Sequence, residues 1–204
     1  MRVSETCINS ENDVLNVLME RSAILKGHFL LTSGLHTDTY IQCAKLHEVP
    51  SVCVFLCEAL LKKARASDHE DLLNVDVIAS PAIGGLMFGY EIARQLGVNF
   101  VFFERVDGCF TLRRGFNVAE NAKVLIVEDV ITTGKSSLAV IKAVTALGGK
   151  IAGELSIVTR AKDVDIPVPV VSLLSLDIKN YRAEEVPDFL AQIPISKPGS
   201  SFIK

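Results

Sequence analysis

The chain has 204 residues, of which 49% are apolar and 22% charged, a composition typical of one well-packed domain rather than a disordered chain. The formal net charge of −3 gives no electrostatic reason to expect nucleic acid or an anionic membrane as the main partner. The first ten residues lack the apolar stretch of a secretory signal, and the most hydrophobic run, 52–61, is too short to span a bilayer. The five cysteines form no Cys-x-x-Cys pair and no metal-ligand spacing with the four histidines. We therefore expect a reduced, cytoplasmic protein without a structural zinc site.

The amino-terminal part predicts a helix, two strands and a second helix, in that order. Apolar residues recur at helical spacing over 11–25, which fits an amphipathic helix. Residues 29–31 and 39–41 are expected to form strands on either side of a Ser-Gly turn. Residues 51–65 predict the second helix, which ends in a basic cluster suited to a helix carboxyl terminus.

A regular alternation of strands and helices then begins. The expected strands are 75–79, 100–103, 124–127, 151–158 and 168–174, and the expected helices are 84–96 and 135–147. Strands that are apolar throughout and separated by helices indicate a mainly parallel sheet that is covered on both faces. The region 13–50 and the tail after 176 do not follow this alternation, so we assign them to a small cap beside the sheet.

The clearest functional signal is the segment VLIVEDVITTGKSS at 124–137. An apolar strand runs into two carboxylates, Glu128 and Asp129, and a Thr-Thr-Gly-Lys-Ser turn then opens a helix. Ligands of parallel sheets bind at the carboxyl ends of strands, and the unpaired N–H groups of a helix amino terminus attract phosphate. Gly134 permits close approach of the backbone, and ionised carboxylates suit sugar hydroxyls or Mg²⁺ because they only accept hydrogen bonds. The motif therefore predicts a site for a phosphorylated sugar.

Two other phosphate-binding motifs do not fit this segment. The Walker pattern requires a glycine five positions before Gly134, where the chain has Asp129. The dinucleotide pattern fails at 84–89, because Leu86 stands where the middle glycine belongs. An ordinary strand-to-helix turn with Ser/Thr capping remains the alternative, although two adjacent acids at a strand end are costly unless a ligand uses their charge.

The same segment resembles the ribose-phosphate motif of the type I phosphoribosyltransferases: two acids, two hydrophobic residues, Thr-Thr-Gly, and then small or polar residues. This resemblance implies an α/β fold with a mainly parallel five-stranded core sheet, flanking helices and a small hood. We expect a single domain, with the core over about 50–175 and the hood formed by about 1–45 and the carboxyl-terminal tail. The family's substrate is 5-phospho-α-D-ribose 1-diphosphate (PRPP), used with Mg²⁺. The residues implied to bind PRPP are Glu128, Asp129, Val130, Ile131, Thr132, Thr133, Gly134, Lys135 and Ser136.

Other segments resemble the orotate phosphoribosyltransferases, in the branch with a short, Arg-rich mobile loop. They follow the family's order along most of the chain: 27–29, 31–36, 40–44, 80–85, 104–105, 111–116, 193–194 and 197–200. The chain departs from the pattern at Thr32 and Gly84, where many relatives have lysine, and at 186–192, which contains no cysteine. These departures leave the 128–136 motif intact.

Two loops are expected to handle the diphosphate. The loop 80–85 has no bulky side chain near its glycines and resembles the loop that receives diphosphate through backbone groups; a Gly-rich packing turn is the alternative. The loop 105–115 carries Arg105, Arg113 and Arg114, and guanidinium groups bind phosphate oxygens bidentately. We expect Arg105 and at least one of the other two to close over the diphosphate, against the alternative of a solvated basic hairpin. In the family this loop reaches the site of a neighbouring subunit, which implies a homodimer.

Base selection rests on fewer residues. The resemblance implies that Thr132 and Arg160 contact orotate. Arg160 follows the predicted strand 151–158, so it should lie at the carboxyl edge of the sheet, where a cation suits the orotate carboxylate. The alternative is an Arg160 that pairs with a nearby surface acid such as Asp163.

From these residues we expect transfer of ribose 5-phosphate from PRPP to N1 of orotate, which gives orotidine 5′-monophosphate and diphosphate in pyrimidine biosynthesis. The expected catalytic residues are Glu128, Asp129, Arg105 and Arg113. A phosphoribosyltransferase for another base and a non-catalytic PRPP sensor remain as alternatives. Arg160 and the Arg-rich loop argue against the first, and the lack of an added nucleic-acid-binding segment argues against the second.

Overall fold

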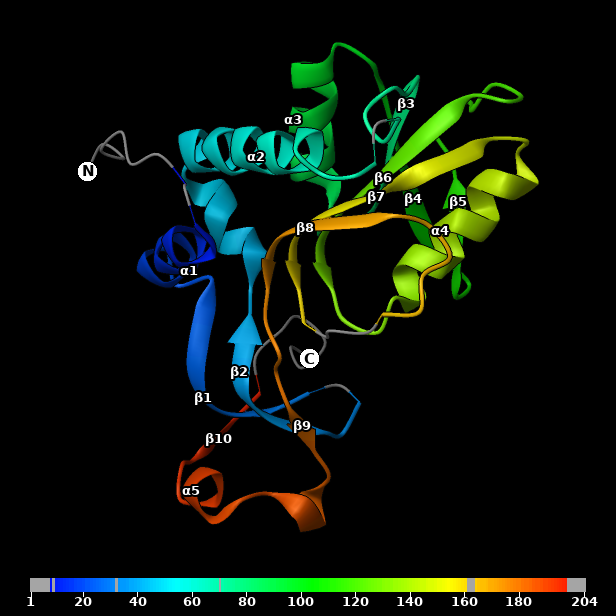
Figure 1. Ribbon diagram of the computed structural model, residues 1–204. Helices are drawn as coiled ribbons and strands as arrows, with labels where there is room; N and C mark the ends of the chain where they lie inside the picture. Colours follow the sequence, from blue (N-terminus) through cyan, green and yellow to red (C-terminus); the bar gives the residue numbers. More distant parts are fainter. Residues whose placement is uncertain (1–7, 9, 32, 70, 161–163, 198–204) are drawn as a thin grey trace.

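The computed structural model describes residues 8, 10–31, 33–69, 71–160 and 164–197. Its main body is a six-stranded sheet with the strand order β5-β4-β3-β6-β7-β8 (Figure 1). The strands are β3 (Val77–Pro81), β4 (Asn99–Val106), β5 (Cys109–Leu112), β6 (Lys123–Ile131), β7 (Lys150–Thr159) and β8 (Val170–Ser175). Five of them run parallel, and β5 pairs antiparallel with β4 at the edge. The predicted five-stranded parallel sheet is therefore confirmed, with one additional antiparallel strand.

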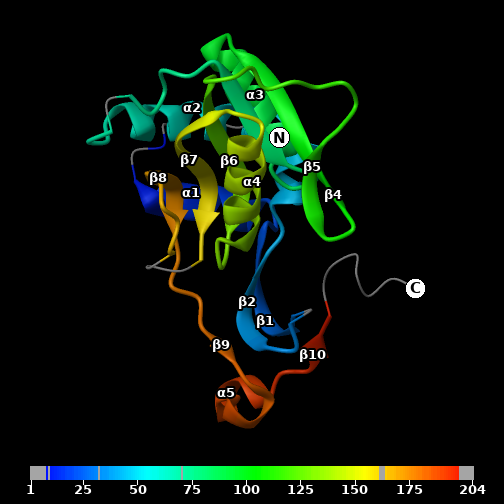
Figure 2. The ribbon, with the colours of Figure 1, turned by 90° about the vertical axis from the view of Figure 1, so that its right-hand side faces the viewer.

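Helices cover both faces of this sheet. The four longer helices are α1 (Glu11–Glu20), α2 (Pro50–Arg65), α3 (Leu86–Leu96) and α4 (Lys135–Ala146). The first three share a hydrophobic core on one face, and α4 packs on the other (Figure 2). Strand β6 is buried from both sides, because Leu125 and Val127 belong to the first core and Val124 and Ile126 to the second. Two-sided burial explains why the strand is apolar without alternation. Within the described residues, no helix has both the length and the apolar character needed to cross a membrane.

Local sequence signals set several helix ends. Ser10 caps α1 in a capping box: its hydroxyl accepts from the Asp13 N–H at 3.3 Å, and its own N–H donates to the Asp13 carboxylate at 3.0 Å. Pro50 opens α2, where its missing N–H costs no hydrogen bond. Gly97 ends α3 with a left-handed φ of 70°, and Gly134 precedes α4 with a φ of 73°.

The predicted helix over 11–25 is too long. Helix α1 ends at Glu20, and a turn that contains Ser22 with a φ of 54° follows it. Ile24 and Leu25 then begin the first strand instead of extending the helix. Their apolar side chains continue the helical spacing, so periodicity alone does not reveal the boundary.

A second sheet, with the strand order β10-β1-β2-β9, lies beside the carboxyl edge of the main sheet (Figure 1). Its strands are β1 (Ile24–Leu30), β2 (His36–Ile41), β9 (Asn180–Tyr181) and β10 (Ile195–Ser196), and the neighbouring short helices are η1 (Cys43–Glu48), η2 (Ala183–Glu185) and α5 (Asp188–Ala191). Buried His28 and His36 contact each other at 2.6 Å between Nε2 and Nδ1, and His28 Nδ1 lies 3.2 Å from the Ile193 carbonyl oxygen. The sheet therefore joins the amino-terminal segment to the tail, the two segments from which a hood is predicted.

Candidate active site

The two predicted acids lie at the carboxyl end of β6. Glu128 is buried, Asp129 is half-buried, and the Asp129 N–H donates to Glu128 Oε2 at 3.2 Å. Burial, reinforced by the charge of Asp129, raises the pKa of Glu128 to about 9. The two carboxyl groups are therefore not equivalent: Glu128 holds its proton at neutral pH, and Asp129 is the more accessible of the two.

The turn after the acids is open to solvent and leads directly into α4. Thr132, Thr133 and Lys135 are exposed, Val130 and Ser136 are half-buried, and Ile131 and Gly134 are buried. Gly134 is the N-cap residue of α4, and no side chain caps the helix. The first N–H groups of a helix have no partner within it, so an uncapped and accessible start can receive an anion.

The glycine-bearing loop after β3 packs directly against the acids, because β3 is a neighbour of β6 in the sheet. A Cβ atom at Gly84 would lie 2.7 Å from Asp129 Cγ, and closer still to Oδ1. A Cβ atom at Gly85 would lie 2.5 Å from the Val127 carbonyl oxygen. Neither position has room for a side chain, so the loop presents its backbone to the acids. In this chain the Asp129 carboxyl fills the space that a lysine at position 84 would need.

Arg160 lies at the same edge of the sheet, one residue beyond β7. Its N–H donates to the Ile131 carbonyl oxygen at 2.9 Å, and its Nη2 donates to Asn180 Oδ1 at 3.3 Å. Its Nε is buried and has no hydrogen-bond partner in the described part of the chain. Burial lowers the pKa of Arg160, and the nearby Asp38 and Tyr40 oppose that shift. The guanidinium is thus partly desolvated, with an unused donor.

Tyr40 of β2 connects this arginine with the acids. Burial raises the pKa of Tyr40, the charge of Asp129 raises it further, and the charge of Arg160 opposes the shift. Both charges act on the phenol, so Tyr40 lies within electrostatic range of the acid and of the arginine. The second sheet therefore contributes a side chain to the electrostatic environment at the ends of β6 and β7.

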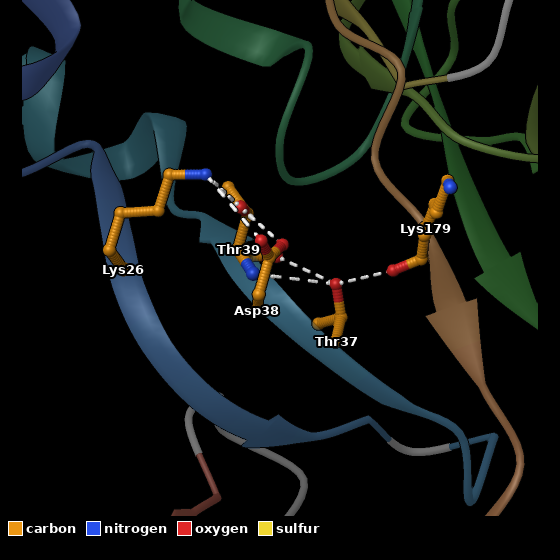
Figure 3. A network of polar contacts seen from close by, with 5 residues as sticks. All are labelled: Lys26, Thr37, Asp38, Thr39 and Lys179. Carbon is orange, nitrogen blue, oxygen red and sulfur yellow. Dashed lines mark hydrogen bonds and ion pairs between the residues drawn. The ribbon is translucent and has the colours of Figure 1, made fainter. Parts of the chain in front are cut away.

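A polar network holds this part of β2 in place (Figure 3). Lys26 Nζ donates to Thr39 Oγ1 at 2.6 Å, and Thr39 Oγ1 donates to Asp38 Oδ1 at 2.7 Å. The Thr37 hydroxyl donates to the Lys179 carbonyl oxygen at 3.0 Å. These bonds connect β2, the strand that carries Tyr40, to β1 and to the segment that precedes β9.

The predicted Arg-rich loop is the hairpin of β4 and β5. Its turn is formed by Asp107 and Gly108, which have φ values of 49° and 83°. Arg105 Nη1 donates to the Gly108 carbonyl oxygen at 3.1 Å, and its guanidinium lies 4.6 Å from the centre of the Phe110 ring. Arg105 is therefore bound to its own hairpin.

The other two arginines of this segment differ in their contacts. Arg114 pairs with Glu104 through two hydrogen bonds of 2.9 and 2.8 Å, whereas Arg113 is exposed. In the described ranges, neither Arg105 nor Arg113 forms a hydrogen bond or ion pair with the acids of β6. The structure brings together the acids, the turn and the arginine after β7, and it leaves the hairpin arginines apart from them.

Some expectations fall on residues that the structure does not describe, namely Thr32, Asp163 and residues 198–200. Among the described cysteines, those at 43, 53, 57 and 109 are free thiols. No group of three or more His, Cys, Asp or Glu side chains in the described ranges is placed to hold a metal ion.

Three residues near Arg160 were not predicted from the sequence as site residues: Tyr40, Asp38 and Asn180. The only sequence signal for Tyr40 was its place in the segment 40–44, which follows the family pattern without marking a role. Asn180 reaches Arg160 from 20 positions further along the chain, and no local spacing reports such a contact.

Comparison with known proteins identifies the family and the fold of the chain. Residues 53–181 match the family model described as a phosphoribosyl transferase domain. The chain is 44% identical over 188 residues to the orotate phosphoribosyltransferase of Caldanaerobacter subterraneus subsp. tengcongensis, covering 92% of this chain and 96% of that protein. It is 43% identical over 192 residues to the orotate phosphoribosyltransferase of Erythrobacter litoralis, covering 94% and 98%. The crystal structure of orotate phosphoribosyltransferase from Aeropyrum pernix has a similar fold, with a TM-score of 0.69 at 24% identity over 80% of this chain and 93% of that one.

The parallel sheet, the paired acids and the open turn are those of a type I phosphoribosyltransferase. The identities to two orotate phosphoribosyltransferases exceed 40% over nearly the whole length, and they specify the family within this class. The chain belongs to the orotate phosphoribosyltransferase family.

Proposed function

We propose that this protein transfers ribose 5-phosphate from PRPP to N1 of orotate, releasing diphosphate and orotidine 5′-monophosphate for pyrimidine biosynthesis. One observation carries the proposal: Asp129, the open turn at 132–136 and Arg160 lie at one edge of the sheet, where β6 pairs with β7. In that arrangement the turn would bind the phosphate, Asp129 the sugar and Arg160 the carboxylate of the base.

The PRPP-binding part comprises residues 128–136. The exposed hydroxyls of Thr132 and Thr133 and the uncapped N–H groups at the start of α4 would hold the 5′-phosphate. Asp129 and Glu128 would bind the ribose hydroxyls, and the charge of Asp129 would favour the positive charge that develops on the ring as the diphosphate leaves. A covalent nucleophile is not needed, because positioning and charge stabilisation suffice for such a transfer.

The orotate part would use Arg160 and Thr132. Arg160 keeps an unused Nε donor in a partly desolvated position, which suits a carboxylate ligand. Its N–H bond to Ile131 fixes it next to the phosphate turn. The distance between the two parts is therefore set by the pairing of β6 with β7.

The carboxylate of Asp129 at the end of β6 fits Mg²⁺ that arrives with the substrate. Mg²⁺ in proteins is commonly held by one or two carboxylates together with substrate phosphates and water. Asp129 is accessible enough to serve as such a ligand, whereas Glu128 is buried and protonated. When bound, the metal would neutralise charge on the departing diphosphate.

We further propose a homodimer in which Arg105 and Arg113 act on the diphosphate in the partner's site. A strip of exposed apolar side chains next to the hairpin supports this: Tyr90 is 57% exposed, Met87 47% and Phe116 38%. Phe102 contacts Phe116 at 5.2 Å between ring centres, so the strip continues across β4. Exposed apolar patches of this kind mark subunit interfaces.

Two further assignments remain our proposals. The division into a core over about 50–175 and a hood formed by about 1–45 and the tail is supported by the separate second sheet. A cytoplasmic location fits an enzyme of nucleotide synthesis, and cell fractionation would test it.

A panel of bases tests the proposed function. Purified protein should consume orotate, followed by its ultraviolet absorbance, only when both PRPP and Mg²⁺ are present. Adenine, guanine and uracil should be poor substrates, since they lack the carboxylate that Arg160 would bind. Turnover of a purine in place of orotate, or PRPP binding without turnover of any base, would contradict the proposal.

A further inference from the structure

Glu154 is a fully buried carboxyl group in the middle of β7, outside the residues assigned to substrate binding. Its Oε1 accepts a hydrogen bond from the Ser137 hydroxyl at 2.8 Å. Its Oε2 is also buried and has no hydrogen-bond partner within the described residues. An acid with one unsatisfied oxygen is costly to bury, and the cost is far greater when the acid is charged.

The position of this carboxyl group links it to the phosphate turn. Ser137 is buried in the first turn of α4, three residues after Gly134. In the pairing of β6 with β7, Glu154 lies opposite Ile126 and Ser156 lies opposite Glu128. Glu154 and Glu128 therefore project from the same face of the sheet, in adjacent positions along it.

The protonation state of Glu154 changes within the physiological range. Burial raises the pKa of Glu154 to about 7, and the hydrogen bond from Ser137 opposes the shift. The charge of Glu154 is also one of the causes that raise the pKa of Glu128. Around neutral pH, the Glu154 side chain next to the start of α4 is therefore either a neutral acid or a buried anion.

Few other charges face this position. Strand β6 contributes Glu128, β8 contributes none, and α4 carries only Lys135 and Lys142, both exposed. The loop that packs over Gly134 carries the exposed Asp165. Among the described residues, a negative charge on Glu154 is therefore compensated by the Ser137 hydroxyl and by the helix dipole, and a bound phosphate would use the same dipole.

We propose that Glu154 is a positioning residue that acts through Ser137 on the phosphate turn, so that the protein binds the 5′-phosphate group more tightly when Glu154 carries a proton. The inference rests on the proposed function, because it takes the start of α4 to be the phosphate site. It assigns Glu154 no contact with substrate. By linkage, phosphate binding is accompanied by proton uptake at Glu154.

Titration calorimetry with ribose 5-phosphate between pH 7 and pH 8.5 tests this inference, because the ligand's phosphate is largely dianionic throughout that range. The affinity of the wild-type protein should fall about fivefold over the range, as expected for two charges several ångströms apart inside a protein. Glu154→Gln fixes the neutral form, so its affinity should change less than about twofold.

Two more variants make the test specific. Ser137→Ala keeps the acid and removes its hydrogen-bond donor, so the affinity loss should move to higher pH. Glu91→Gln is the matched control, since Glu91 is another buried acid but pairs with Arg94 on α3; it should retain the wild-type pH profile. The Ser137→Ala profile decides the matter if Glu154→Gln does not fold.

Two results would overturn the inference and are distinguishable from each other. If the wild type binds ribose 5-phosphate and the Glu154→Gln or Ser137→Ala profile matches it, Glu154 has no role in phosphate binding, and the proposed function stands. If the wild type binds neither ribose 5-phosphate nor PRPP at any pH, the phosphate site itself is wrong, and the proposed function falls with the inference.

Discussion

Gly84→Ala should reduce activity strongly while leaving the fold intact. The new Cβ would lie 2.7 Å from Asp129 Cγ, whereas carbon atoms in contact prefer about 3.5–4.0 Å. The Asp129 carboxyl must therefore move by about 1 Å, and a displacement of that size in a catalytic group costs roughly 100-fold in rate. We expect kcat/KM for orotate to fall about 100-fold, or about 2.7 kcal/mol of transition-state stabilisation.

The assay follows orotate absorbance at saturating Mg²⁺, together with the thermal midpoint of each variant. Gly27→Ala is the matched control, because its Cβ would meet only the far end of the Phe29 ring, at 3.2 Å, and that ring can shift. The control should keep its activity within about threefold. If Gly84→Ala also stays within threefold of wild type, Asp129 either does not need its observed position or has no role in the reaction.

Three further predictions concern the rest of the site. Arg160→Lys keeps the charge and loses the planar fork, so the KM for orotate should rise at least tenfold while the KM for PRPP stays within about twofold; equal changes in both would contradict a base-specific role. The pKa of Glu128 in the folded protein, about 9, lies above its ordinary value, so this group lowers stability progressively as pH rises from about 4.5 towards 9. Glu128→Gln removes that dependence, and urea unfolding at pH 6 and pH 8 should show a smaller loss of stability than in wild type; an identical loss would count against the buried, protonated acid. If the hairpin serves the partner's site, a mixture of the Asp129→Asn and Arg113→Ala variants should regain about a quarter of wild-type activity, because about half of the randomly paired dimers are mixed and each of these has one intact site of two. No recovery would rule out a shared site.

The sequence predicts the core sheet well because burial on both faces leaves a strong local pattern. The segment 124–127 is apolar without interruption and lies in β6, and the segment 151–158 is mostly apolar and lies in β7. Strand β5 was missed, since Cys109–Leu112 is short and mostly exposed, so it carries little hydrophobic signal. The end of α1 was missed because Ile24 and Leu25 continue its spacing into β1.

Some residues of the candidate site can be predicted from the local sequence, whereas others depend on contacts between distant segments. Residues 128–136 form one contiguous segment, so their identities and order predict the proposed phosphate and sugar site. Tyr40 and Asn180 approach Arg160 only through the second sheet, and their role depends on tertiary packing that no spacing records. Glu154 lies inside a mostly apolar strand, and its contact with Ser137 becomes visible only in the structure.

Asp129→Asn provides the most direct measurement on the central claim. The substitution keeps the size and removes the charge, so orotate turnover dependent on PRPP and Mg²⁺ should fall about 100-fold or more while the thermal midpoint stays within a few degrees of wild type. Full turnover in the folded variant would show that the acid at the end of β6 does not hold the sugar, and the account of the site would have to be abandoned.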